Sequence, residues 1–243
     1  MITLPPLGNL DLELWHALLD LAEREPADWT LIGGQMVLLH ALESGRTPLR
    51  VSQDLDLVVD ARVRPPALAR IVSSLGDLGF AQAAISADEI AHRFQRGRAV
   101  IDVLAPDGIG PRTDLRTVGG ATTVEIGGGT YALARSGPVS VSVGDRRGVV
   151  HRPDLAGAIL IKAVAATRDT RRGPERHLRD LAFLVSLVTD PIAMTEDLGP
   201  ANVARVQRVT ELQDPRNAAW GLLGDETVVA DAHAAFRLIT AGS

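Results

Sequence analysis

Three aspartates are the residues of this chain whose type and spacing could do chemistry. Asp54 and Asp56 alternate with leucine in the apolar segment 54–59, and Asp102 stands between two apolar residues in the segment 99–104. Residues two apart in a β-strand point to the same face, so Asp54 and Asp56 should lie about 7 Å apart on one face. If the strand that carries Asp102 is a neighbour, all three carboxylates converge on that face.

A cluster of three carboxylates is electrostatically unfavourable unless a cation neutralises it. Carboxylate oxygens are ligands that Mg²⁺ takes, and two such ions about 3.5–4 Å apart serve phosphoryl and nucleotidyl transfer. The sequence therefore predicts Asp54, Asp56 and Asp102 as the metal ligands and catalytic residues of a Mg²⁺ site. The alternative is an Asp-x-Asp pair on a solvent-exposed strand, and the third aspartate and an upstream glycine pair count against it.

The glycine pair Gly33-Gly34 separates a short apolar run, 29–32, from a helical segment, 35–43. Such a turn directs free backbone N–H groups and the positive end of a helix at a phosphate, so we expect Gly33 and Gly34 to bind nucleotide. No Gly-Lys-Ser/Thr follows, which excludes a P-loop, and a plain tight turn is the alternative. The glycine run 127–129 lies between predicted strands, where we expect a hairpin turn.

A basic stretch follows in the second half of the chain, although the formal net charge of the protein is −5. Lys162 stands in an otherwise apolar helix, so its ammonium group either reaches solvent past its apolar stem or faces a ligand. Asp180 lies in the next predicted helix, where an intrahelical pair with Arg176 is the alternative to a role in the site. Between positions 162 and 180, six basic residues stand against three acidic ones: Lys162, Arg168, Arg171, Arg172, Arg176 and Arg179 against Asp169, Glu175 and Asp180.

Arg171 and Arg172 precede a Gly-Pro pair, so this segment is expected to form a basic loop between two helices. The loop either contacts phosphates of a nucleoside triphosphate or RNA, or is a solvated turn. Arg50, which comes shortly before the acids, and Arg176 are weaker candidates for the same contact.

The elements that must position these residues change character along the chain. Alternating helices and strands predict an α/β (α+β) domain with a mixed sheet over residues 1–152, and helical periodicity predicts a helical domain over residues 153–243. Residues 188–200, which contain two prolines, read as a loop. The expected helices are 11–25, 35–43, 66–78, 154–168, 174–188, 201–212 and 225–239, and the expected strands are 29–32, 55–59, 90–95, 99–104 and several short ones between 122 and 151.

Composition narrows the class of protein. Apolar residues make up 46% and charged residues 23% of the chain, which is typical of a globular protein, and the absence of cysteine excludes disulfides and thiolate metal sites. We see no secretory signal peptide and no apolar run of roughly 20 residues, so a cytoplasmic protein with no membrane segment is expected. The negative net charge means that nucleic acid would bind only at a local basic patch.

The order glycine pair, acid-x-acid strand and third acid on a later strand resembles the signature of the polymerase-β-like nucleotidyltransferase superfamily. Within it, the segments 160–163 and 177–184, with Arg168 between them, look like the downstream motifs of the AbiEii family, the toxins of type IV toxin–antitoxin systems. The segments 92–94 and 116–120 are also similar to members of that family. The resemblance covers roughly residues 29–187. The chain departs from it at Gly34, where many members have serine.

This resemblance implies a mixed-sheet nucleotidyltransferase domain, followed by a helical domain, that moves a nucleoside monophosphate from an NTP with Mg²⁺. It implies that Lys162 and Arg168 hold the triphosphate and that Asp180 orients them or acts as a base. It also implies an RNA acceptor, with the 3′ end of tRNA as the favoured candidate, and a separately encoded antitoxin. Two other functions stay open: a nucleotidyltransferase acting on a small molecule such as an antibiotic, and a catalytically silent nucleotide- or partner-binding module.

Overall fold

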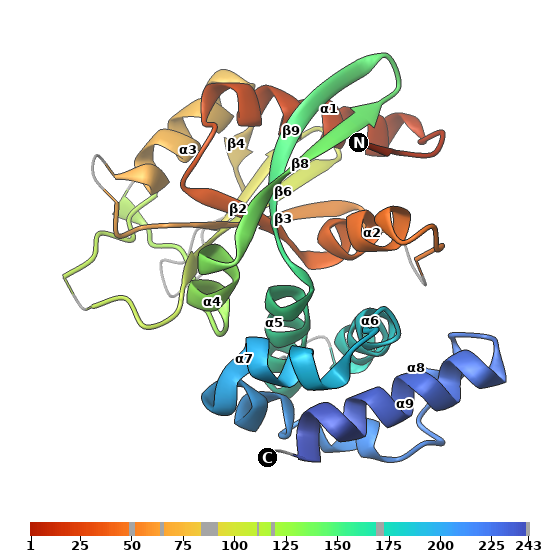
Figure 1. The fold of residues 1–243 in the computed structure, drawn as a ribbon. Helices are drawn as coiled ribbons and strands as arrows, with labels where there is room; N and C mark the ends of the chain where they lie inside the picture. The colour runs from red at the N-terminus through yellow and green to blue at the C-terminus, as the bar shows by residue number, and fades with distance from the viewer. Residues whose placement is uncertain are drawn as a thin grey trace.

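The structure is a computed structural model of the 243-residue chain. It describes residues 1–48, 52–63, 66–83, 92–110, 112–117, 120–168 and 173–241. The described residues form mixed strands and helices up to Pro153 and helices after it, and Figure 1 shows the sheets above a group of helices that ends at the C-terminus. The predicted mixed α/β class is confirmed.

The main sheet has the strand order β2-β3-β6-β5-β4, with β7 paired to β6. Strands β3 and β6 are parallel neighbours, and β5 and β6 form an antiparallel hairpin around Gly97. This parallel pairing brings β3 and β6, which are distant in sequence, side by side. The bounds are Trp29–Ile32 (β2), Asp54–Val59 (β3), Ala81–Gln82 (β4), Arg93–Arg96 (β5), Ala99–Pro106 (β6) and Glu125–Ile126 (β7).

A smaller sheet joins the N-terminus to the middle of the chain. In it β8 (Ser136–Val143) lies between β1 (Ile2–Thr3) and β9 (Arg146–Pro153). Helices α1 (Asn9–Arg24) and α3 (Ala67–Asp77) contact each other on the side of the main sheet that lies uppermost in Figure 1. The leucines that alternate with the aspartates of β3 are fully buried, as expected for side chains that point away from the acids.

The remaining helices lie on the opposite side of the main sheet. Helix α5 leaves β9 and packs against α6 and α7, and α7 in turn packs against α9 (Figure 1). One continuous hydrophobic cluster reaches from Ile2 to Ile239, so the helices after Pro153 share apolar contacts with the sheet region. The division at residue 152 stays a prediction. These helices are α2 (Gly33–Glu43), α4 (Gly129–Ala134), α5 (Leu155–Arg168), α6 (Glu175–Val185), α7 (Pro191–Val206), the 3₁₀ helix η2 (Thr210–Gln213), α8 (Ala218–Gly221) and α9 (Glu226–Ala241).

Two local predictions are wrong. The glycine run 127–129 does not join two strands as a hairpin turn but opens helix α4, with Gly128 as its left-handed N-cap at φ 87°. Residues 191–200 are not a loop: Asp190 caps α7 through its side chain, Pro191 starts the helix, and only Gly199 departs from helical geometry. In the part of the chain that the structure describes, no helix combines the length and the apolar character needed to cross a membrane.

Candidate active site

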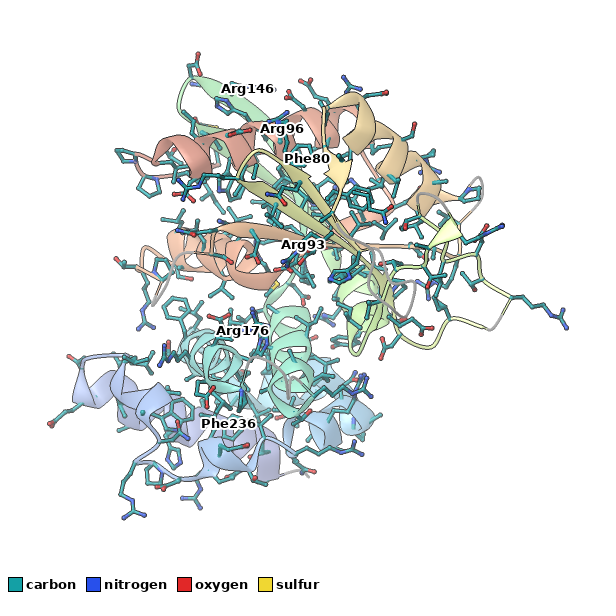
Figure 2. All side chains as sticks on the ribbon, turned by 180° about the vertical axis from the view of Figure 1, so that it is seen from behind. Phe80, Arg93, Arg96, Arg146, Arg176 and Phe236 are labelled. Carbon is teal, nitrogen blue, oxygen red and sulfur yellow. The ribbon has the colours of Figure 1, made fainter. Side chains whose placement is uncertain are left out.

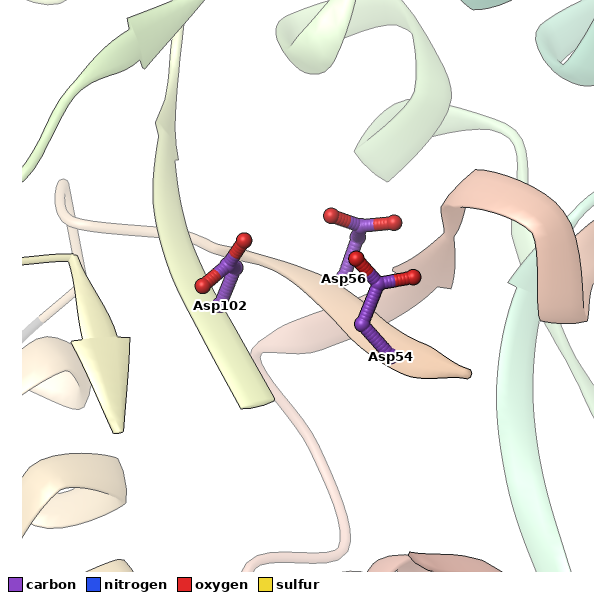
Figure 3. Close-up of side chains that lie close together, drawn as sticks. All are labelled: Asp54, Asp56 and Asp102. Carbon is purple, nitrogen blue, oxygen red and sulfur yellow. The ribbon is translucent and has the colours of Figure 1, made fainter. Parts of the chain in front are cut away.

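The three aspartates meet on one face of the main sheet. Asp56 and Asp102 are register partners across the parallel pair β3–β6, and Asp54 lies two residues before Asp56 on the same face. One carboxylate oxygen from each lies within 4.8 Å of the others. Figure 3 shows the side chains of Asp54 and Asp56 rising from one strand toward that of Asp102 on the next. The expected convergence is therefore present.

The carboxylate of Asp56 is electrostatically disfavoured in this cluster. Burial, and then the negative charges of Asp54 and Asp102, raise the pKa of Asp56 to about 7, while Lys162 and Arg176 act in the opposite direction. Nearby positive charge favours the ionised form of such a group at neutral pH. Three convergent carboxylates with a destabilised middle member form an all-oxygen donor set that fits Mg²⁺.

Position 33 requires glycine because no larger residue fits beside Asp56. Gly33 has a φ of +71°, and a Cβ atom there would lie 1.9 Å from Oδ2 of Asp56. This contact places the start of helix α2 directly against the acid cluster, where its positive end favours an anionic ligand. Gly33 and Gly34 both line the cleft that holds the acids.

A short chain of hydrogen bonds through Ser52 fixes the position of the Asp54 carboxylate. The buried side chain of Gln35 donates from Nε2 to the backbone oxygen of Ser52 over 2.6 Å, and the Ser52 hydroxyl donates to Oδ1 of Asp54 over 2.5 Å. Sequence analysis did not identify either residue. Their spacing of 17 positions offers no periodic signal, because the contact depends on how α2 lies against β3.

Asp102 is held by Arg93, whose role the sequence analysis also missed. Nε and Nη2 of Arg93 donate to the two oxygens of Asp102 over 2.8 and 2.7 Å. The two residues are register partners in the hairpin β5–β6. The expected strands 90–95 and 99–104 flank Gly97, and a tight turn at this glycine sets residue 93 opposite residue 102.

The opposing wall of the site comes from α5 and α6. Nζ of Lys162 donates to Oδ2 of Asp180 over 2.7 Å, and their side chains are only 4% and 2% exposed. Lys162 therefore does not reach bulk solvent, and Asp180 pairs across the two helices with Lys162. Lys162 lines the cleft, whereas Asp180 is behind it. Arg168, the last residue of α5, also lines the cleft.

A cleft of about 920 Å³ joins these walls. Arg176 also lines it, and its contact with phosphates stays a prediction. A third side of the cleft comes from residues 124–127, which the sequence analysis assigned only to strands and a turn. A Cβ at Gly127 would lie 2.5 Å from Val164 and 2.7 Å from Nη1 of Arg168, so this glycine lets the loop pack on α5. The predicted contact residues Arg50, Arg171 and Arg172 lie outside the described residues.

Comparison of the chain with protein-family models, with curated proteins and with solved structures found no match in any of the three. The family resemblance therefore stays an expectation from the sequence motifs.

Proposed function

We propose that this protein is a Mg²⁺-dependent nucleotidyltransferase that moves a nucleoside monophosphate from an NTP to a hydroxyl group of RNA. The observation that carries the proposal is the convergence of Asp54, Asp56 and Asp102 beside the glycine turn at Gly33, in one cleft with Lys162. Acids that fit metal ions, backbone that fits phosphates and a facing cation are the three parts that phosphoryl chemistry requires.

In the proposed reaction the acceptor hydroxyl oxygen forms a bond to the α-phosphorus of the NTP. The bond from that phosphorus to the oxygen bridging to the β-phosphate breaks, and pyrophosphate leaves. Asp102 takes the hydroxyl proton and passes it to solvent, while the amides of Gly33 and Gly34, Lys162 and Arg168 hold the triphosphate. Mg²⁺, when bound by Asp54, Asp56 and Asp102, supplies positive charge that stabilises the attacking and leaving oxygens.

The charge of the cleft favours RNA over a cationic small molecule as the acceptor. Apart from the three aspartates, the only acidic residue that lines the cleft in the described part of the chain is Glu125. The basic residues that line it are Arg93, Arg98, Lys162, Arg168 and Arg176. A pocket for an aminoglycoside-like cation requires the reverse balance, whereas a polyanion is attracted to this one.

The tRNA 3′ end as acceptor, the role of a toxin, the separately encoded antitoxin and the cytoplasmic location belong to the same proposal and rest on the resemblance to the AbiEii family. The complete set of acids supports an active enzyme over a silent binding module, because a module that only bound nucleotide has no use for three carboxylates held this close.

The test is incubation of the purified protein with total RNA and each of the four α-labelled NTPs, with Mg²⁺ and with EDTA. We expect Mg²⁺-dependent label on RNA of tRNA size. Asp56→Asn, with an unchanged melting temperature within a few degrees, should lose more than about 100-fold in rate, because outer partners of metal ligands alone cost up to that factor.

Label on a small-molecule acceptor would support the antibiotic-type alternative, and nucleotide binding without transfer would support the silent module. Near-normal turnover by Asp56→Asn would remove the catalytic assignment of the acid cluster.

A further inference from the structure

Arg93 is a basic residue in direct contact with Asp102. It contacts Asp102 along one edge of its guanidinium group, through Nε and Nη2. Within the described residues, Nη1 has no hydrogen-bond acceptor. A guanidinium group has five N–H donors in a rigid plane, so a second edge, formed by Nη1 and the other hydrogen of Nη2, is available to a further acceptor.

The exposure of the pair shows where that edge lies. The side chain of Asp102 is 8% exposed, but that of Arg93 is 33% exposed, and Arg93 lines the cleft. An arginine needed only to neutralise a buried aspartate has no reason to keep a third of its side chain open to the cleft. A guanidinium group is always positively charged in a protein, so Arg93 can attract an anion.

Arg93 also lies apart from the cations assigned to the triphosphate. Lys162 and Arg168 belong to α5 and Arg176 belongs to α6, whereas Arg93 belongs to the strand next to Asp102. Figure 2 shows Arg93 on the sheet and Arg176 on the helical side of the molecule. The acids thus have basic groups on two different walls of the cleft, and one set is sufficient for one triphosphate.

We propose that Arg93 binds a phosphodiester of the acceptor, next to the attacking hydroxyl, with the guanidinium edge that Asp102 leaves open. This inference rests on the proposed function and adds to it the residue that selects a nucleic acid acceptor. Two parallel N–H donors match two phosphate oxygens, which is the geometry that arginine offers and lysine does not. Because Asp102 fixes the guanidinium plane, the bound phosphate brings the hydroxyl toward the carboxylate that takes its proton.

The test uses an RNA acceptor, labelled in the transfer reaction, whose last phosphodiester is either natural or replaced by an uncharged methylphosphonate. With the wild-type protein, the methylphosphonate should lower kcat/KM for the acceptor about 10- to 100-fold, the size of one charge-assisted hydrogen-bonded contact. With Arg93→Gln, the natural acceptor should lose a similar factor, and the methylphosphonate should cause little further loss. The KM for NTP should stay near that of the wild type.

Two variants control for structural effects. Arg93→Lys keeps the positive charge beside Asp102 but loses the second edge. The difference in kcat/KM between the natural and the methylphosphonate acceptors should therefore be smaller than in the wild type. Arg96→Gln lies on the same strand and loses an ion pair with Glu13, away from the cleft, and should show the full wild-type difference between the two acceptors.

An equal methylphosphonate effect in the wild type and in Arg93→Gln would overturn the assignment of Arg93 while leaving RNA transfer intact. If the wild-type protein labels no RNA, the proposed function and the role of Arg93 both fail. The reaction of the wild-type protein with the natural acceptor shows this without any variant.

Discussion

At the scale of single residues, the acid cluster depends on the absence of one side chain. Gly33 combines a left-handed backbone with a Cβ position that would overlap the Asp56 carboxylate. Either property alone would favour glycine. Together they allow the turn at Gly33 to pack directly against the Asp56 carboxylate of strand β3.

Gly33→Ala should therefore harm function more than its backbone strain alone explains. We expect a loss of about 1–3 kcal/mol in the free energy of unfolding from strain and overlap, and a large loss of transfer activity because Asp56 must move. Gly45 is the matched control, because it has a similar φ of +66° but no described atom within 4 Å of the position that a Cβ would take. Gly45→Ala should lose a similar part of its stability to backbone strain and keep its activity.

Urea unfolding curves and transfer rates of the two variants separate the effects. Full activity in Gly33→Ala would mean that Asp56 tolerates a shift of its carboxylate, and the close fit would then have no catalytic meaning.

The three acids could be predicted from the sequence because strand alternation and a third apolar-flanked aspartate follow local rules. Arg93 and Ser52 could not be assigned with the same ease. Arg93 requires the exact pairing of two strands, and Ser52 requires the position of Gln35 on a packed helix. The role of a side chain that contacts a partner from another element depends on how the two elements pack. The periodicity of one segment does not predict that packing.

At the scale of elements, the pairing of α5 with α6 sets the basic wall. Lys162 and Asp180 are buried together at their crossing, and no rule of spacing within either helix joins them. The glycine run 127–129 was misjudged for a related reason: glycines in a turn and glycines that allow close helix contact look the same in sequence. At residues 191–200, the prolines suggested a loop, whereas Pro191 stands at the first turn of α7, where proline is well tolerated.

The pair Lys162–Asp180 predicts a separation of stability from binding. Lys162→Met removes the ammonium group that pairs with the buried Asp180 carboxylate, and breaking a buried ion pair from one side should cost up to about 3–5 kcal/mol in the free energy of unfolding. The double variant Lys162→Met/Asp180→Leu should recover most of that stability, because a well-packed apolar pair replaces a buried ion pair at little cost. Neither protein should bind an NTP analogue as the wild type does.

Denaturation curves and NTP-analogue titrations of both variants test this. An NTP affinity that recovers together with stability in the double variant would show that Lys162 acts only in packing.

Helix α2 is joined to the end of β9 by a buried histidine. His40 hydrogen-bonds through Nε2 with the backbone oxygen of Pro153 and lies against Arg152, which also pairs with Glu43. Burial, and then the positive charge of Arg152, lower the pKa of His40 to about 3, while Pro153 and Asp154 act in the opposite direction. This junction holds the helix that starts at Gly33 against the strand that leads into α5.

The sign of the pH effect follows from that lowered pKa. Below pH 6.5 the unfolded chain protonates this histidine but the folded protein does not, so stability present above pH 6.5 is lost as the pH falls toward 3. His40→Gln removes this dependence. The difference in free energy of unfolding between wild type and His40→Gln should be about 2 kcal/mol larger at pH 7 than at pH 5. Parallel stability profiles for the two proteins in urea would contradict a neutral, buried His40.

At the scale of the whole molecule, the cleft is lined by residues of the main sheet and of helices α5 and α6, and Figure 1 shows these helices on one side of the sheet. Polar contacts join the two sides around it. Arg205 of α7 pairs with Asp107, whose carboxylate also accepts hydrogen bonds from the N–H groups of Gly128 and Thr130 at the start of α4. Arg46, three residues after the end of α2, donates to the hydroxyl of Ser186, the residue that follows α6. A ligand that contacts the acids and Lys162 at once adds a further link between the same two sides.

Binding of an NTP with Mg²⁺ should therefore stabilise the whole fold. At a concentration of 100 times its Kd, a ligand adds about 2.7 kcal/mol, which corresponds to a rise in Tm of roughly 5–10 °C for a chain of this length. We expect this rise with a non-hydrolysable NTP analogue and Mg²⁺, little rise when EDTA replaces Mg²⁺, and little rise in Asp56→Asn or in Lys162→Met/Asp180→Leu. Arg116→Ala, which breaks an exposed ion pair with Asp114 away from the cleft, should keep the full rise. The decisive result is that the rise in Tm is lost both in Asp56→Asn and in Lys162→Met/Asp180→Leu. A nucleotide held only by the acids, or only by the helices, would still stabilise one of these two variants.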